Sequence, residues 1–83
     1  MSPQVELVKK FLADNDSVSL EELRANIYDA YHVWLATDYN CDAEYAAFKA
    51  TRDAYWAAVD CDDAKRWKEL AIKAVKEYEE LTR

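Results

Sequence analysis

The 83-residue sequence has no glycine and one proline, is 52% hydrophobic and 34% charged, and carries a formal net charge of −6. Its hydrophobic content excludes a disordered tail, and its length leaves no room for a deep substrate cleft beside a core. Without glycine, the positive-φ turns on which β proteins depend are disfavoured. The composition therefore predicts one all-α domain over residues 1–83.

The cellular location is predicted from two features that the sequence lacks, a membrane-spanning segment and a signal peptide. No apolar run approaches the roughly 18 residues that a membrane-spanning helix requires. The N-terminal sequence MSPQVELVKK also lacks the basic-then-apolar order of a signal peptide. We therefore expect a cytoplasmic protein, of a cell or of an infected host cell, with no membrane partner.

The negative charge is concentrated in one part of the chain. Residues 14–44 hold eight acidic residues against Arg24 alone, a net charge of −7, whereas residues 45–60 and 61–83 are each neutral. The eight are Asp14, Asp16, Glu21, Glu22, Asp29, Asp38, Asp42 and Glu44. Such a field repels phosphate and anionic lipid and attracts basic surfaces, so direct nucleic-acid binding is disfavoured and a basic protein partner is favoured.

The first helix is predicted over residues 3–13. Ser2 is a suitable N-cap, and Pro3 suits the first helical position. Apolar residues then recur at helical spacing from Val5 to Leu12. The polar run DNDSVS that follows ends this helix, because its side chains compete for backbone hydrogen bonds.

The second helix is predicted over residues 20–39. Ser19 and Glu22, three positions later, form a capping box at its start. At 100° per residue one face is apolar. That face consists of Leu20, Leu23, Ile27, Ala30, Tyr31, Trp34 and Leu35. Asn26 lies on the opposite side, where we expect solvent.

Two further helices are predicted over residues 42–60 and 62–82. Asp42, or the backbone before it, can cap the third helix, and Asp60 or Asp62 can cap the fourth. The apolar stripe of the fourth helix is Ala64, Trp67, Leu70, Ala71, Ala74, Tyr78 and Leu81. Short connections favour antiparallel neighbours, so we predict a small antiparallel bundle of three long helices and a shorter N-terminal helix.

The two cysteines, Cys41 and Cys61, flank the predicted third helix. At 1.5 Å per residue they would lie roughly 30 Å apart. A disulfide requires Cα atoms within about 7 Å of each other. An intramolecular disulfide and a metal site shared by the two cysteines are therefore excluded if that helix is continuous. The sequence also lacks the close-spaced pair of ligands that zinc sites use, so no other metal site is predicted.

No residue set specifies a reaction. The stretch DNDSVSLEEL resembles the end of an EF-hand calcium loop, but the match fails, because Ser19 stands at the central glycine and Ala25 stands where the loop requires glutamate. His32 has no serine or cysteine placed by the local sequence as a nucleophile, and Glu21 and Glu22 point about 100° apart. We therefore expect no catalytic residue, no cofactor, no metal and no small-molecule substrate.

The predicted third helix is apolar on two opposite faces. Alanines form one face: Ala43, Ala46, Ala47, Ala50, Ala54, Ala57 and Ala58. The other, which we name the aromatic face, consists of Tyr45, Phe48, Arg52, Tyr55 and Trp56. Such a helix is either buried on both faces inside the domain or shares one face with a partner. Tyrosine, tryptophan and arginine dominate interface energies, which favours the aromatic face as the shared one.

Two functional hypotheses follow. In the first, a non-catalytic protein-binding module presents its acidic residues to a basic partner, as an inhibitor or adaptor. By analogy with small acidic helical proteins encoded by viruses, a nucleic-acid mimic is one concrete form. In the second, a structural protein forms a homo-oligomer through the aromatic face, and the acidic region keeps it soluble.

Overall fold

The computed structural model describes residues 2–83, which form four α-helices in chain order. They are α1 (Pro3–Ala13), α2 (Leu20–Leu35), α3 (Asp42–Val59) and α4 (Ala64–Leu81), with a short 3-10 helix, η1 (Asn15–Ser17), between the first two. The helices hold 11, 16, 18 and 18 residues, which confirms the predicted all-α bundle of three long helices and a shorter N-terminal one. Within residues 2–83, no helix is both long and apolar enough to cross a bilayer.

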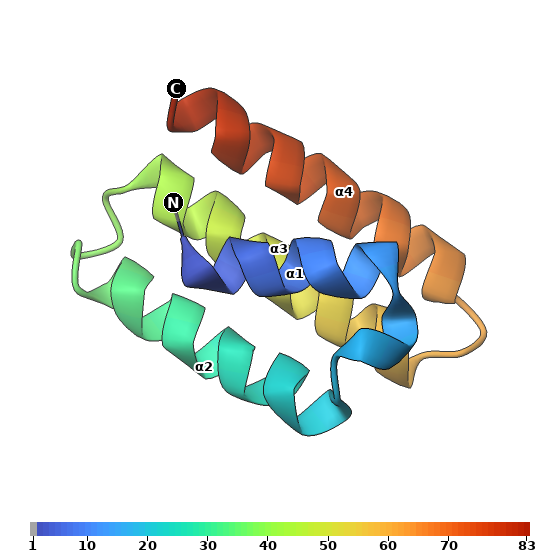
Figure 1. Ribbon diagram of the computed structural model, residues 1–83. Coiled ribbons are helices and arrows are strands. Elements are labelled where there is room, and N and C mark those ends of the chain that lie inside the picture. The colour runs from blue at the N-terminus through green and yellow to red at the C-terminus, as the bar shows by residue number, and fades with distance from the viewer. Residues whose placement is uncertain (1) are drawn as a thin grey trace.

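The four helices run in alternating directions. In Figure 1, α2, α3 and α4 lie side by side as one layer with α3 in the middle, and α1 lies across α3 on one side of this layer. Accordingly, α3 contacts each of the other three helices. The side of the layer away from α1 is where the candidate site lies.

Side-chain caps fix the starts of the first two helices, as predicted. Ser2 Oγ accepts a hydrogen bond from the Val5 backbone N–H at 3.3 Å. At the start of α2, Ser19 Oγ accepts from the Glu22 N–H, and Glu22 Oε1 accepts from the Ser19 N–H, both at 3.1 Å. The reciprocal pair is the predicted capping box, which satisfies two amide groups that the helix cannot pair internally.

At α4 the predicted caps Asp60 and Asp62 are wrong, whereas α3 starts as in the second predicted alternative, from the backbone before Asp42. Cys41 is the N-cap of α3 and Asp63 that of α4, and neither side chain caps a backbone N–H of the described chain. Asp42 lies inside the first turn of α3, where its charge favours the helix dipole but its side chain is past the capping position. Asp60 instead accepts a hydrogen bond from Trp67 Nε1 at 3.2 Å.

The second helix ends at Leu35 rather than at residue 39. Asp38 and Tyr39, with φ of 56° and 62°, follow in the left-handed region that the glycine-free composition made unfavourable. Thr37 Oγ1 donates to the Trp34 carbonyl at 2.6 Å, and the Tyr39 ring meets the Trp34 ring edge-on at 4.7 Å. These contacts, between residues three and five positions apart, accompany a backbone conformation that non-glycine residues disfavour.

The core forms where α1, α3 and α4 meet. The alanine face of α3 is buried at its centre, at Ala46, Ala47, Ala50, Ala54 and Ala57. The other helices contribute Val5, Val8, Phe11, Leu23, Ala71, Ala74, Val75 and Tyr78. The small side chains of α3 thus meet larger residues from its neighbours, which allows those helices to approach α3 closely.

On α2 and α4, the side of the helix that is buried differs from the predicted apolar stripe. Leu20 and Leu35 of α2, and Leu70 and Leu81 of α4, are exposed although each belongs to a predicted stripe. Asn26, expected in solvent, is buried and donates from Nδ2 to the Gln4 carbonyl of α1 at 2.9 Å. The reason is that α1 packs against α2, so α2 turns the side bearing Asn26 inward.

Candidate functional site

The aromatic face of α3 lies opposite its buried alanines and away from α1. The alanines share the core with Val5, Val8 and Phe11 of α1, and residues half a helical turn away point to the other side of the layer. We name this side of α2 and α3 the open face. It is formed by Arg24, Ile27, Tyr28 and Tyr31 of α2 and by Tyr45, Phe48, Arg52, Tyr55 and Trp56 of α3.

The aromatic face of α3 is only partly covered within the described chain. Tyr45 is 38% exposed, Trp56 is 41% exposed and the Arg52 side chain is 43% exposed. From the adjacent helix, Tyr28 is 55% exposed. Burial of this second face inside the domain is therefore only partial in residues 2–83, because Phe48 and Tyr55 are half-buried and Tyr45 and Trp56 are exposed.

One half of the aromatic face packs against the end of α2. Trp34 stacks on Phe48 with ring centroids 5.7 Å apart and planes 18° apart, and lies 4.8 Å from the Tyr45 ring. Tyr31 packs on Phe48 at 5.9 Å, and its hydroxyl lies 3.2 Å from that of Tyr39. The Trp34 indole nitrogen is buried among these rings without a hydrogen-bond partner in residues 2–83.

The other half of the aromatic face borders a cavity between α2 and α3. Trp56 stacks on Trp67 of α4 at 6.1 Å and meets Tyr55 edge-on at 5.7 Å. Trp56 and Tyr55 then face Tyr28, Ile27 and Arg24 across a cavity of about 450 Å³. This cavity is broad enough to accept a large apolar side chain from outside.

Arg52, at the centre of the aromatic face, is tied to its sequence neighbour Asp53. Arg52 Nε donates to Asp53 Oδ1 at 3.3 Å, and the Asp53 side chain is only 5% exposed. Burial raises the pKa of Asp53, and the Arg52 and Lys49 charges partly oppose that rise. The burial of Asp53 was not predicted from the sequence. Its position on the border of the alanine face was the one sequence feature that could have indicated it.

The eight predicted acidic residues do not form one patch. They lie around the start of α2 (Asp14, Asp16, Glu21, Glu22), along its side (Asp29) and around the connection to α3 (Asp38, Asp42, Glu44). Because α2 is 16 residues long, the two end groups are separated by about 24 Å of helix. All are exposed except the half-buried Glu44. The Ser19 backbone hydrogen bond lowers the pKa of Glu22.

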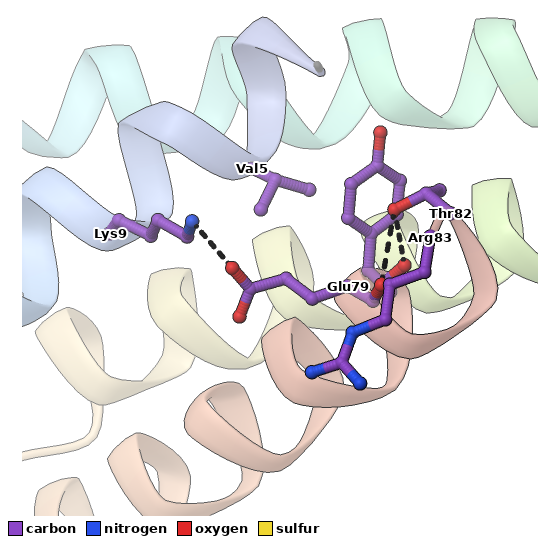
Figure 2. A pocket seen from close by; sticks show the side chains of 6 residues that line it. Val5, Lys9, Glu79, Thr82 and Arg83 are labelled. Atoms are coloured by element: carbon purple, nitrogen blue, oxygen red, sulfur yellow. Dashed lines mark hydrogen bonds and ion pairs between the residues drawn. The ribbon is translucent and has the colours of Figure 1, made fainter.

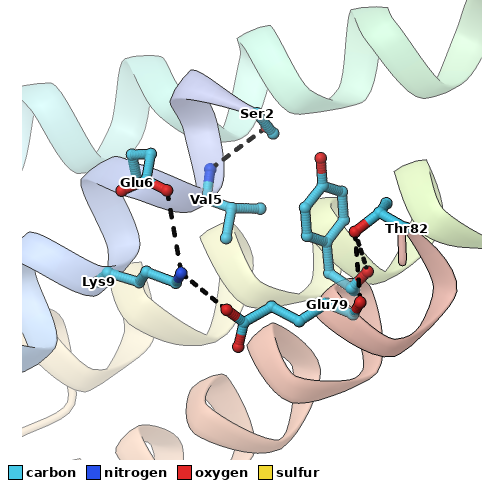
Figure 3. Close-up of polar contacts among 7 residues, drawn as sticks. Ser2, Val5, Glu6, Lys9, Glu79 and Thr82 are labelled. Carbon is cyan, nitrogen blue, oxygen red and sulfur yellow. Dashed lines mark hydrogen bonds and ion pairs between the residues drawn. The ribbon is translucent and has the colours of Figure 1, made fainter.

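A second depression lies between α1 and the end of α4, but its polar groups bond one another. Figure 2 shows Val5, Lys9, Glu79, Thr82 and Arg83 around this space of about 310 Å³. Lys9 Nζ lies 2.8 Å from Glu79 Oε2, and this hydrogen bond raises the pKa of Lys9. Figure 3 shows the same contact beside the Thr82 hydroxyl, which donates to the Tyr78 carbonyl at 2.9 Å. The contact between Lys9 and Glu79 joins α1 to α4.

The cysteines and the histidine lie apart from one another. Cys41 precedes α3 and Cys61 follows it, and 18 helical residues separate them by about 27 Å, beyond the reach of a disulfide. His32 is exposed, with Nδ1 2.7 Å from the Tyr28 carbonyl. Within residues 2–83, no group of three or more potential ligands among His, Cys, Asp and Glu is placed to hold a metal.

No protein-family model matches this chain, and it matches no curated protein and no solved structure. The chemistry and geometry of its own residues are therefore the basis for assigning a function.

Proposed function

We propose that this chain is a non-catalytic protein-binding module that docks a partner through its open face. The observation that carries the proposal is the exposure of Tyr28, Tyr45 and Trp56 on one side of two adjacent helices, with Arg52 between them. Aromatic residues and arginine are enriched among the side chains that dominate binding energy. Clustered exposure of such residues marks an interaction surface, whereas single exposed apolar residues are ordinary.

The surface area supports reversible docking rather than obligate assembly. The accessible surface is 5298 Å². A compact monomer of this mass is expected to expose about 5,100 Å². The chain is thus as compact as a protein that folds alone, and its helices do not depend on a partner for their core. We infer that the open face is occupied only when the partner is present.

A second copy of the chain is the less favoured occupant. Two copies meeting face to face about a two-fold axis bring the same residues together. With the axis near the middle of the aromatic face, Arg52 of each copy would approach its own equivalent, so the terminal amino groups, which are donors only, would meet other donors instead of an acceptor. Homo-oligomerisation therefore stays the alternative. A measurement of the mass of the protein in solution distinguishes it from the binding of another protein.

A contact with a basic partner is the second candidate function. It is favoured because none of the eight acidic residues in the segment 14–44 forms an ion pair with another described residue, whereas Glu77 and Glu79 of α4 do. Carboxylates without an internal partner are available to external cations. Their separation into two end groups means that a basic partner would contact one end of α2 or span its whole length.

Site-specific photo-crosslinking in an extract of the natural host tests both candidates. A photoreactive residue replaces Tyr28 on the open face, Asp29 on the acidic side of α2, or Ile72 on α4 in a third variant. Ile72 is a matched control because it is also an exposed apolar residue, 42% exposed, outside the open face. We expect protein adducts from position 28 that excess unlabelled wild type suppresses and excess Trp56→Gln does not.

The three positions give distinguishable outcomes. Adducts formed equally at positions 28 and 72 would contradict the open-face proposal, because they would reflect exposure alone. Adducts that form only at position 29, and only when the irradiation is carried out at low salt, would replace it with the basic-partner function, since surface charge pairs weaken with ionic strength.

A further inference from the structure

We propose that the partner of the open face is an acidic amphipathic helix, seated along the groove between α2 and α3. This inference rests on the proposed function and adds the chemistry of the partner. It is carried by the sign of the charges on the open face, which is opposite to that of the chain as a whole.

The arginines of the open face have unused hydrogen-bond donors. Arg24 lines the 450 Å³ cavity and forms no ion pair with any described residue. Arg52 uses Nε for Asp53, which leaves its two terminal amino groups for an external acceptor. Paired terminal amino groups of this kind bind a carboxylate through two parallel hydrogen bonds.

Counting Arg52 itself, three basic residues and two acidic ones line a depression on its α4 side. Lys49, Arg52 and Lys73 line a depression of about 210 Å³ together with Asp53 and Glu77. Lys49 Nζ lies 3.3 Å from Glu77 Oε1 and 4.8 Å from the centre of the Tyr45 ring, so two of these charges pair. Asp53 is buried below Arg52. With Lys49 paired to Glu77 and Arg52 to Asp53, Lys73 is the one charge of this depression that pairs with no described residue, and a cation there favours an anionic partner.

The shape of the groove fits a helix with one apolar stripe. Ile27, Tyr28, Tyr55 and Trp56 form apolar walls, and Arg24 stands at the edge of the same cavity. A helix laid between two others places residues at i, i+3, i+4 and i+7 into such a groove. Its flanking positions then lie over the arginines, where glutamate or aspartate would complement them.

A nucleic acid is the less favoured occupant, although aromatic and basic residues also suit stacked bases. A bound strand would continue past the ends of the groove. Asp38 adjoins Tyr39 at one end, and Asp60 adjoins Val59 at the other. These carboxylates would repel a continuing row of phosphates, whereas a helix carrying a few carboxylates at its middle avoids them.

The test uses two synthetic peptides and the full-length protein. Each peptide has about 18 residues, enough for roughly five helical turns. Both carry leucine and phenylalanine at helical spacing; one has glutamate at the flanking positions and the other has lysine. Binding is followed by the tryptophan fluorescence of the protein. We expect the glutamate peptide to bind at least about tenfold more tightly, since one close charge pair accounts for such a factor.

Charge reversal supplies the matched controls. Arg24→Glu is expected to abolish the preference for the glutamate peptide, and Arg24→Glu with Arg52→Glu to reverse it. Lys76→Glu makes the same charge change at an exposed position of α4 and is expected to leave the preference intact. Arg24→Glu keeps the test decisive if the Arg52 substitution unfolds the protein, because Arg24 is exposed and pairs with no described charge.

Three results would overturn the inference: equal affinity for both peptides, binding of neither, or tighter binding of a single-stranded oligothymidine than of the glutamate peptide. Each is compatible with open-face crosslinks to a protein partner, so the inference can fail while the proposed function stands. Conversely, loss of the crosslinks at position 28 would remove the proposed function itself.

Discussion

Arg52 Nε donates a hydrogen bond to Oδ1 of its neighbour Asp53 at 3.3 Å, although consecutive helical residues point about 100° apart. The pair straddles the border between the surface and the core, with the Arg52 side chain 43% exposed and that of Asp53 5% exposed. The arginine therefore neutralises a carboxylate that burial would otherwise leave unpaired.

Asp53→Asn is expected to change how stability depends on pH. Burial raises the folded-state pKa of Asp53 above its ordinary value, so between those two values the folded protein holds a proton that the unfolded chain has released. Stability from this group is therefore present at low pH and lost as pH rises through the folded-state pKa. The asparagine variant has no such group to titrate. As pH rises through this window, its free energy of unfolding should therefore increase relative to that of the wild type.

Denaturant unfolding at a series of pH values measures that difference. The matched control is Asp29→Asn, which alters an exposed aspartate of α2. A difference between Asp53→Asn and wild type that stays constant with pH, or grows toward acid, would contradict the assignment of Asp53 as a buried carboxylate.

The alanine face of α3 should not tolerate larger residues. Ala54 is fully buried, so Ala54→Leu must separate α3 from its neighbours and is expected to lower the free energy of unfolding by about 1–3 kcal/mol. Ala58, on the same face but exposed near the end of the helix, is the control. We expect Ala58→Leu to change stability by less than about 0.5 kcal/mol. Equal effects of the two substitutions in thermal unfolding would argue against this packing.

The capping box should contribute measurably to stability. Ser19→Ala removes the hydroxyl that accepts the Glu22 N–H and is expected to destabilise the protein by about 1 kcal/mol. Ser19→Asp restores an acceptor at the same position and should recover most of that loss. Chemical denaturation of the three proteins decides this, and an aspartate variant as weak as the alanine variant would show that the cap is not the cause.

The chain alone is expected to be a monomer at micromolar concentration. Sedimentation equilibrium should give 9.7 kDa, because the core of the described residues forms within one chain. Phe48→Asp should leave this mass unchanged. A mass of twice that value, reduced by Phe48→Asp, would instead support the structural homo-oligomer.

The local features were within reach of sequence reasoning. Ser2 and Ser19 cap helices because their partners are only three residues away, and the two faces of α3 follow from helical periodicity alone. The all-α fold followed from composition and these signals. None of them depends on how one helix meets another.

Only the tertiary structure decided which surfaces those helices cover. The position of α1 over the layer buries the alanines and leaves Trp56 and Tyr45 exposed. The same contact turns Asn26 inward, and packing against α4 puts Asp53 out of solvent. Periodicity gives the angle of a residue about its own helix axis, whereas burial depends on where other helices lie. That arrangement arises from contacts between residues far apart in the sequence.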